Sequence, residues 1–347
     1  MNSTQAQTDM HETLSLLING EFASKGARLA LEFIPRTIFK KQAAAFVERF
    51  QPPFSNEALG HDKAPTTLEL PQLGELSPPL AKLKNTITAL NPDLIAFIVQ
   101  GSLGSNEQVN YSDCDALVII KDDVLQDPKR LSRLAYHLLK ARKYTYEIDP
   151  LQHHGWFVAS ESMMQTWPQH YLPVEALAHA SRLGGNESAP LIFSPASDPK
   201  MSQKHLMGMM ANIEANLDTG IAFENLYRFK GFVSKILLIP ALYYHAKYGN
   251  GIFKRESFAA AQNDFNADEW RIIEFCSKLR LDWPEVSAMS PKFLSLRPGL
   301  MGDIVRRRFS TPVPATMRNL FTNSETNSIR SLHTRIKSNF IEGGTHD

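Results

Sequence analysis

The sequence has little cysteine, almost no net charge and no long hydrophobic run. Only Cys114 and Cys276 occur among 347 residues, and they lie too far apart for a disulfide framework or a zinc-binding spacing. Such scarcity suits a reducing compartment. Lys and Arg number 37 against 36 for Asp and Glu, so the formal net charge is +1. No global field therefore favours nucleic acid or an anionic membrane surface.

Segments that could enter a membrane are also missing. The most apolar run, residues 236–244, has nine residues, whereas a transmembrane helix needs about 20. The first residues, MNSTQAQTDMHETLSLL, lack the basic and apolar stretches of a signal peptide. These absences predict a soluble, cytoplasmic protein without a membrane partner.

The composition is that of an ordinary globular protein, with 43% hydrophobic and 21% charged residues. The length favours two domains or one large one. Six prolines between residues 51 and 79 predict an extended linker. We expect an N-terminal helical segment with this linker over residues 1–76, an α/β domain over 77–195 and a helical domain over 196–347.

The central domain alternates between helical and strand patterns. A helix is expected after Pro78 and Pro79, and another after the N-cap Asp127 and Pro128. Continuous apolar runs predict buried strands, and shorter alternating runs predict further strands. The strand segments are 94–99, 116–120, 144–149 and 154–159. This order predicts the α+β class, with a short mixed sheet and flanking helices.

The two ends of the chain have helical patterns. Residues 8–50 predict helices in pieces, broken at Pro35. Residues 221–248 predict one long helix kinked at Pro240, and residues 267–279 predict another. The mildly basic tail, 306–337, is expected to be a solvated helix or a loose end.

A polar motif interrupts the apolar strands of the central domain. In QGSLGSNEQVNYSDCDALVII, Gly101-Ser102 ends one strand, and ten residues later Asp113-Cys114-Asp115 enters the next. Residues i and i+2 of a strand face the same side, so the two carboxylates repel each other unless a cation lies between them. Glycine lets backbone N–H groups approach a phosphate, and serine adds a donor. The pattern favours a nucleoside triphosphate with its metal, although an Asx-type turn entering a strand is the simpler alternative.

The motif resembles the signature of the nucleotidyltransferase superfamily that includes DNA polymerase beta. The likeness covers about residues 80–160 and implies that domain's fold. It also implies transfer of a nucleoside monophosphate from a triphosphate to a hydroxyl acceptor, with pyrophosphate released. By this resemblance Gly101 and Ser102 bind phosphate, and Asp113 and Asp115 hold magnesium. The family uses two such ions, for which manganese can substitute.

The family also requires a third metal-binding carboxylate on a later strand. Glu147 and Asp149 both lie in YTYEIDPLQHHG. A likeness to the corresponding strand of oligoadenylate synthetases favours Asp149, whose role would be to activate the acceptor hydroxyl. If neither carboxylate reaches the metals, the protein is a catalytically silent nucleotide-binding or protein-interaction module. His153 and His154 follow, either as a base or phosphate contact or as one packed and one solvated side chain.

The helical domain offers basic residues among aromatics. In related nucleotidyltransferases such residues reach the triphosphate across the cleft, and by that resemblance Lys230 is the preferred candidate. The acceptor remains open between a small molecule, a protein and another nucleotide. A long nucleic acid is disfavoured because it normally requires a basic surface.

Overall fold

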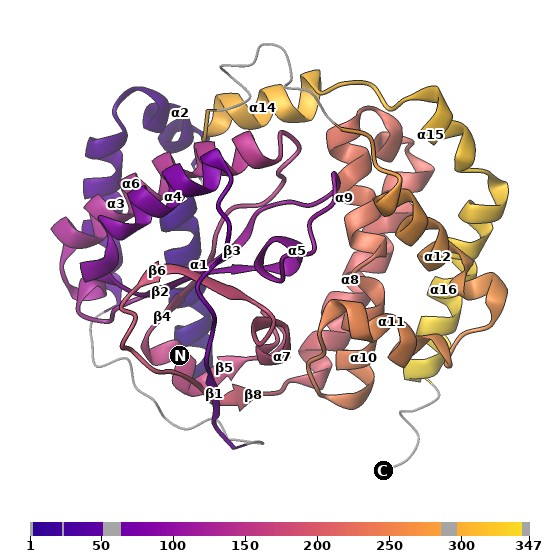
Figure 1. Ribbon diagram of the computed structural model, residues 1–347, viewed down its shortest axis with the longest axis horizontal. Helices are drawn as coiled ribbons and strands as arrows, with labels where there is room; N and C mark the ends of the chain where they lie inside the picture. The colour runs from indigo at the N-terminus through magenta and orange to yellow at the C-terminus, as the bar shows by residue number, and fades with distance from the viewer. Residues whose placement is uncertain (1–2, 23, 51–63, 286–296, 342–347) are drawn as a thin grey trace.

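The computed structural model describes residues 3–22, 24–50, 64–285 and 297–341. It is an α+β protein, mostly helical with small sheets. Figure 1 shows one half that carries the sheets and a second half built of helices, with α14 lying above the space between them. Part of the predicted linker, residues 51–63, lies outside the described residues, and its remainder contains strand β1.

The first half contains three N-terminal helices followed by the sheet-forming segments. In chain order its elements are α1 (Ser3–Asn19), α2 (Lys25–Phe33), α3 (Pro35–Arg49), β1 (Thr66–Leu68), α4 (Pro78–Thr88), η1 (Asn91–Asp93), β2 (Leu94–Gln100), α5 (Gly101–Gly104), β3 (Asp115–Ile120), η2 (Val124–Gln126), α6 (Pro128–Ile148), β4 (Phe157–Ser160), η3 (Ser162–Thr166), β5 (Trp167–Pro168), α7 (Val174–Leu177), β6 (Ser181–Gly185), β7 (Leu191–Phe193) and β8 (Pro195–Ala196). The predicted break before Pro35 is confirmed, since α2 ends at Phe33 and α3 begins at Pro35.

The main sheet has four strands in the order β4-β3-β2-β6. Strand β2 is antiparallel to β3 and β6, while β3 and β4 are parallel. The sheet is therefore mixed, as predicted. Two small sheets, β1-β7 and β5-β8, lie beside it.

Both faces of the main sheet are buried, which explains the continuous apolar runs. On β2, Phe97 and Val99 belong to a core with α1, α3, α4 and α6, while Ala96 and Ile98 belong to a core with η3 and β5. Successive strand side chains point to opposite faces. Because both faces are covered, residues 94–99 of the strand are all apolar. Helices α1 and α3 pack on α6, so the N-terminal helices share the core of the sheet.

Helix α6 begins as predicted but ends later. The side chain of Asp127 accepts hydrogen bonds from the backbone N–H groups of Lys129 and Arg130, and Pro128 occupies the first turn. The strand predicted over residues 144–149 is wrong, because α6 continues to Ile148. Its buried residues Ala141, Arg142, Thr145 and Tyr146 recur at helical spacing, and a short alternating segment does not distinguish this spacing from a strand.

The second half is helical. Its elements are α8 (Pro199–Asp218), η4 (Ile221–Phe223), α9 (Leu226–Ile236), α10 (Ile239–Tyr248), α11 (Lys254–Gln262), α12 (Ala267–Leu281), α14 (Leu300–Phe309), α15 (Ala315–Leu320) and α16 (Asn323–Ile341). The helix predicted over residues 267–279 is confirmed as α12.

Two expectations for this half are wrong. The helix predicted over residues 221–248 is interrupted between α9 and α10, ahead of Pro240, which occupies the first turn of α10. Proline is tolerated there because the first turn needs no N–H donor. The tail is not a loose or fully solvated helix, because Ile329, Leu332 and Ile336 of α16 are buried in the core of the helical half.

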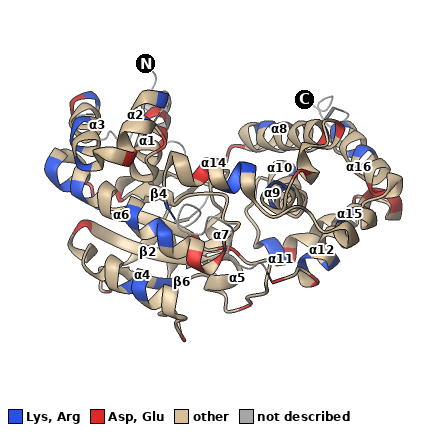
Figure 2. Ribbon diagram, turned by 90° about the horizontal axis from the view of Figure 1, so that it is seen from above, with Lys and Arg blue, Asp and Glu red and all other residues tan. Residues whose placement is uncertain are grey.

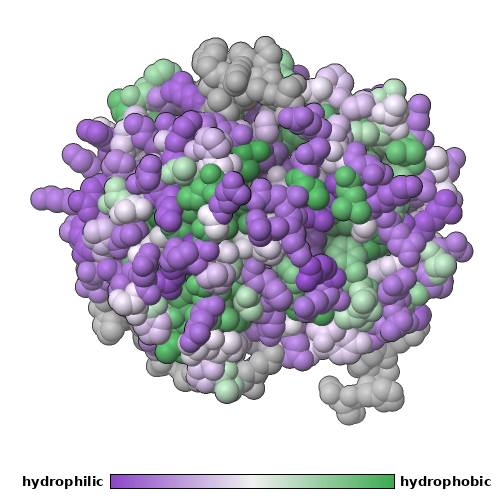
Figure 3. Space-filling model, in the orientation of Figure 1, coloured by the Kyte–Doolittle hydropathy of each residue, from purple (hydrophilic) through white to green (hydrophobic). Residues whose placement is uncertain are grey.

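None of the helices within the described ranges is both long and apolar enough to cross a membrane. On the face shown in Figure 3, hydrophilic side chains dominate and apolar groups are scattered between them. Figure 2 shows Lys and Arg interspersed with Asp and Glu on both halves. This distribution matches the balanced composition of the sequence.

Candidate functional site

The turn after β2 brings the Gly-Ser pair against the carboxylate motif. Strands β2 and β3 pair with Gln100 opposite Asp115, so the turn begins beside the start of β3. Gly101 has a positive φ of 64°, a conformation that favours glycine. A Cβ atom at this position would lie 3.3 Å from Oδ2 of Asp115. The loop of ten residues therefore returns the two parts of the motif to one place.

Hydrogen bonds order the loop between these two parts. The hydroxyl of Ser102 donates to Oγ of Ser112 at 2.7 Å, and the backbone N–H of Val109 donates to the same oxygen at 2.9 Å. Ser112 therefore links Ser102, at the start of the loop, with Val109, near its end. The predicted phosphate contact of Ser102 would use a hydroxyl that is already positioned in this network.

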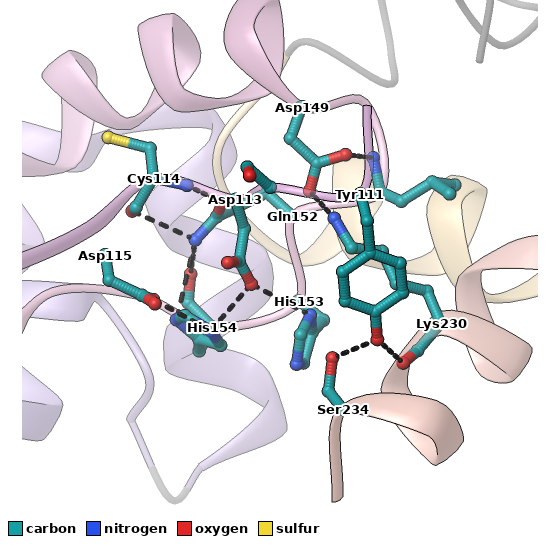
Figure 4. Close-up of polar contacts among 12 residues, drawn as sticks. Tyr111, Asp113, Cys114, Asp115, Asp149, Gln152, His153, His154, Lys230 and Ser234 are labelled. Atoms are coloured by element: carbon teal, nitrogen blue, oxygen red, sulfur yellow. Dashed lines mark hydrogen bonds and ion pairs between the residues drawn. The ribbon is translucent and has the colours of Figure 1, made fainter. Parts of the chain in front are cut away.

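Asp113 and Asp115 face a pair of histidines from the segment between α6 and β4. Nε2 of His154 lies 3.2 Å from Oδ2 of Asp113 and 3.0 Å from Oδ1 of Asp115. Nδ1 of His153 lies 3.8 Å from Oδ2 of Asp113. Figure 4 shows Asp113 directed towards both imidazoles. The side chains of Asp113 and Asp115 therefore face two imidazole rings, so the site offers nitrogen as well as oxygen atoms.

The buried side chain of Gln152 ties the histidine segment to the carboxylate motif. Its Oε1 accepts from the backbone N–H of Cys114 at 2.9 Å, and its Nε2 donates to the carbonyl oxygens of Cys114 and His154. Parallel pairing of β3 with β4 continues this alignment. Cys114 points away into the core, as expected of a small buried hydrophobe, and burial raises the pKa of its thiol.

The charges of the cluster shift the pKa values of its members in opposite directions. Burial and the neighbouring charge of Asp113 raise the pKa of Asp115 to about 6. Burial opposes ionisation of Asp113 as well, but the hydrogen bond from His154 and the charge of Lys230 hold the pKa of Asp113 below its usual range. Burial and His154 lower the pKa of His153 to about 3. Burial would lower the pKa of His154 too, but Asp115 and Asp113 raise it to about 9.

We predict that the two histidines titrate far apart in metal-free protein. Because the carboxylates stabilise the imidazolium, His154 should stay protonated until the pH rises through about 9, whereas His153 should stay neutral down to about pH 3. NMR titration of the ring protons measures both midpoints. Asp115→Asn should lower the His154 midpoint towards its ordinary value of 6.5. A wild-type midpoint already near that value would contradict the arrangement.

The two candidates for the third carboxylate have different surroundings. Glu147 lies on the exposed side of α6, where it pairs with Lys82 at 3.2 Å. Asp149 follows the helix as its C-cap and is buried. Its Oδ2 accepts from Nζ of Lys230 at 2.7 Å, and its Oδ1 accepts from the backbone N–H of Leu151. Of the two, Asp149 is thus the buried carboxylate, and both of its oxygens have partners.

Lys230 connects the two halves of the protein. Its side chain from α9 is fully buried, and its ammonium group lies 5.0 Å from the ring centroid of Tyr111. The Tyr111 hydroxyl lies 2.8 Å from the carbonyl oxygen of Lys230 and 2.5 Å from Oγ of Ser234. Figure 4 shows these contacts beside Asp113. In this arrangement Lys230 contacts Asp149 instead of facing an open cleft.

Lys254 is a second cation that the sequence analysis did not select. It is the first residue of α11 and is partly buried. Burial lowers the pKa of Lys254, and the negative charges of Asp113 and Asp115 oppose that shift. Among the described residues, its ammonium group has no hydrogen bond or ion pair. The sequence gave no signal that selected Lys254, because only the packing of the helices brings its charge near Asp113 and Asp115.

Comparison with known proteins adds no relative. No family model, no curated protein and no solved structure matches the chain. The site therefore has to be interpreted from its own geometry.

Proposed function

We propose that this protein is a polymerase-beta-like nucleotidyltransferase that depends on a divalent metal. It would transfer a nucleoside monophosphate from a nucleoside triphosphate to a hydroxyl acceptor and release pyrophosphate. The observation that carries the proposal is the pairing of Gln100 with Asp115, which leaves the Gly101-Ser102 turn beside the carboxylate motif. An Asx-type turn alone would not require this pairing.

The donor atoms of the site suit a divalent cation. Oδ1 of Asp115 is buried and lies 3.0 Å from Nε2 of His154, but it accepts no hydrogen bond of ordinary geometry among the described residues. Buried polar atoms without a partner are rare and call for an explanation. Asp113 and Asp115 would hold the cation, which stabilises charge on the transferred phosphoryl group and its leaving oxygen. Magnesium, with manganese as a substitute, is the ion expected from the carboxylates alone.

The remaining groups would bind the triphosphate and its acceptor. The turn at Gly101 and Ser102 would contact phosphate, and Lys254 would neutralise phosphate charge from the helical half. A small-molecule, protein or nucleotide hydroxyl would enter on the side of Asp149. To take a proton from that hydroxyl or to bind a second ion, Asp149 has to give up its hydrogen bond to Lys230.

The hydrogen bond between Lys230 and Asp149 also supports a second candidate function. A protein with the same turn and carboxylates, but with its third carboxylate held by Lys230, would bind a nucleoside triphosphate without transferring it. It would then act as a nucleotide-dependent sensor or interaction module. The two candidates differ in whether pyrophosphate is released.

The proposal is tested by titrating each of the four nucleoside triphosphates into the protein with magnesium or manganese. We expect calorimetry to show binding of at least one of them, with pyrophosphate released when an acceptor is supplied. Lys254→Met should weaken this binding by at least about 10-fold, because hydrogen bonds to charged groups contribute about 1.5–3 kcal/mol. Lys337→Met, which removes an exposed lysine from α16, is the matched control.

The outcomes separate the two candidates. Binding without pyrophosphate release for any acceptor class would favour the sensor. If none of the four triphosphates bound, both candidates would be wrong.

A further inference from the structure

The histidine pair gives the site a donor set that a magnesium site does not need. One ring nitrogen of His153, one ring nitrogen of His154 and a carboxylate oxygen of Asp113 all lie within 4.8 Å of one another. Magnesium is bound through oxygen ligands, whereas imidazole nitrogen suits zinc, iron, nickel and copper. The side chains that surround Asp113 therefore point to a different class of ion.

The distances between the ligand atoms suit a single ion. Ligand–zinc distances are about 2.0–2.2 Å, so two ligands of a tetrahedral site lie roughly 3.4 Å apart. The Asp113 oxygen lies 3.2 Å from Nε2 of His154 and 3.8 Å from Nδ1 of His153. These two separations bracket the tetrahedral value, so only small rotations of the side chains are needed to reach it.

Two atoms of the cluster have no hydrogen-bond partner. Nδ1 of His153 and Oδ1 of Asp115 are both buried, and neither forms a hydrogen bond within the part of the chain that the structure describes. Unsatisfied buried polar atoms are destabilising. Oδ1 of Asp115 still has His154 as an ion-pair partner at 3.0 Å, so an ion between the imidazoles and the carboxylates would mainly supply a partner to Nδ1 of His153.

The backbone around the ligands is already held in place. Gln152 bonds to the backbone of both Cys114 and His154, so the carboxylate and histidine segments are joined between their ligand side chains. Groups that orient metal ligands typically change metal affinity by about 10–100-fold. Gln152 is therefore a positioning residue for the cluster.

We propose that Asp113, His153 and His154 bind one first-row transition metal ion, with Asp115 as an additional oxygen ligand. These four ligands would fill a tetrahedral site, and an incoming oxygen would expand it to five-coordinate, as happens in some catalytic zinc sites. From the order of stabilities of first-row divalent ions, zinc binds more tightly than manganese, whereas magnesium prefers oxygen ligands to imidazole. This inference rests on the proposed function for the role of the ion, which would contact the phosphates of the nucleotide.

The inference is tested with metal alone, in the absence of nucleotide. Chelator-treated protein is titrated with zinc, manganese or magnesium chloride in separate calorimetry experiments. We expect one zinc ion per chain, with affinity at least about 100-fold above that for magnesium. Cobalt substitution should give visible absorption bands characteristic of nitrogen and oxygen ligands.

Variants identify the ligands. His153→Ala and His154→Ala should each weaken zinc binding by at least about 100-fold, and His137→Ala, which removes a histidine of α6, should not change it. Because His153 forms no hydrogen bond through Nδ1, its variant should fold even if that of His154 does not. His154→Asp, which supplies an extra carboxylate, should shift the preference towards magnesium.

Other outcomes overturn one proposal or the other. Absence of zinc binding, or zinc binding that survives both histidine substitutions, would overturn the metal site, and His154 would then serve as a charged partner of the carboxylates. If triphosphates still bound with magnesium, the proposed function would stand without the zinc site. If the protein bound zinc but none of the triphosphates, the proposed metal site would stand and the proposed nucleotidyltransferase function would be wrong.

Discussion

Replacing Asp113 with asparagine is expected to reduce nucleotidyl transfer by about 1,000-fold while the fold remains intact. Asp113 is the carboxylate that contacts both histidines, at 3.8 Å from His153 and 3.2 Å from His154, and it lies two residues before Asp115, where β3 begins. A metal ion contributes several kcal/mol to transition-state stabilisation, and about 1.4 kcal/mol corresponds to tenfold in rate. Asparagine keeps the shape of the side chain but removes the charge that holds the ion.

Pyrophosphate release under saturating triphosphate measures this loss, and thermal unfolding verifies the fold. Glu147→Gln is the matched control, because it removes the other candidate carboxylate, which pairs with Lys82 on the exposed side of α6. Activity of that variant should stay within about twofold of the wild type. Retained transfer in Asp113→Asn, or equal losses in both variants, would contradict the metal assignment of Asp113.

Replacing Lys230 with methionine is expected to lower the free energy of unfolding by about 3–5 kcal/mol. The side chains of Lys230 and Asp149 are 0% and 5% exposed. Removing the ammonium group leaves the Asp149 carboxylate buried without its counter-charge, which costs more than the pair itself contributes. Burial already raises the pKa of Asp149, and Lys230 is the main group that opposes this shift.

Urea unfolding of the single and double variants in a double-mutant cycle isolates the interaction free energy between Lys230 and Asp149. Asp149→Asn keeps an oxygen for the N–H of Leu151, so the double variant with Lys230→Met should recover part of the lost stability. The exposed pair of Lys82 and Glu147 provides the control, since Lys82→Met should cost less than about 1 kcal/mol. A similarly small loss for Lys230→Met would show that water reaches Asp149 in solution.

Local patterns of the sequence predicted strands β2 and β3 and the start of the longest helix that flanks their sheet. The apolar runs of β2 and β3 are continuous because cores cover both faces of the sheet. Helix α6 begins where Asp127 can cap it and where Pro128 fits the first turn. Strand periodicity also placed Asp113 and Asp115 on one face, and Cys114 on the other.

Local patterns failed where a segment fits two periodicities. Residues 144–149 alternate over too short a length to separate a strand from the last turns of a helix. In the structure, α6 continues because Thr145 and Tyr146 extend its buried face. The same change moved Glu147 to the exposed side and left Asp149 at the end of the helix.

The sequence by itself determined the Gly101 turn, the spacing to Asp113 and Asp115, and the two strands that flank this motif. Only the tertiary structure decided which side chains surround that pair. Lys230 lies 81 residues from Asp149, and Lys254 approaches from a helix of the other half. Local backbone geometry sets which side chains along one segment face the same side. The partners Lys230 and Lys254 come from helices that are distant in sequence, so a local hydrophobic pattern cannot predict them.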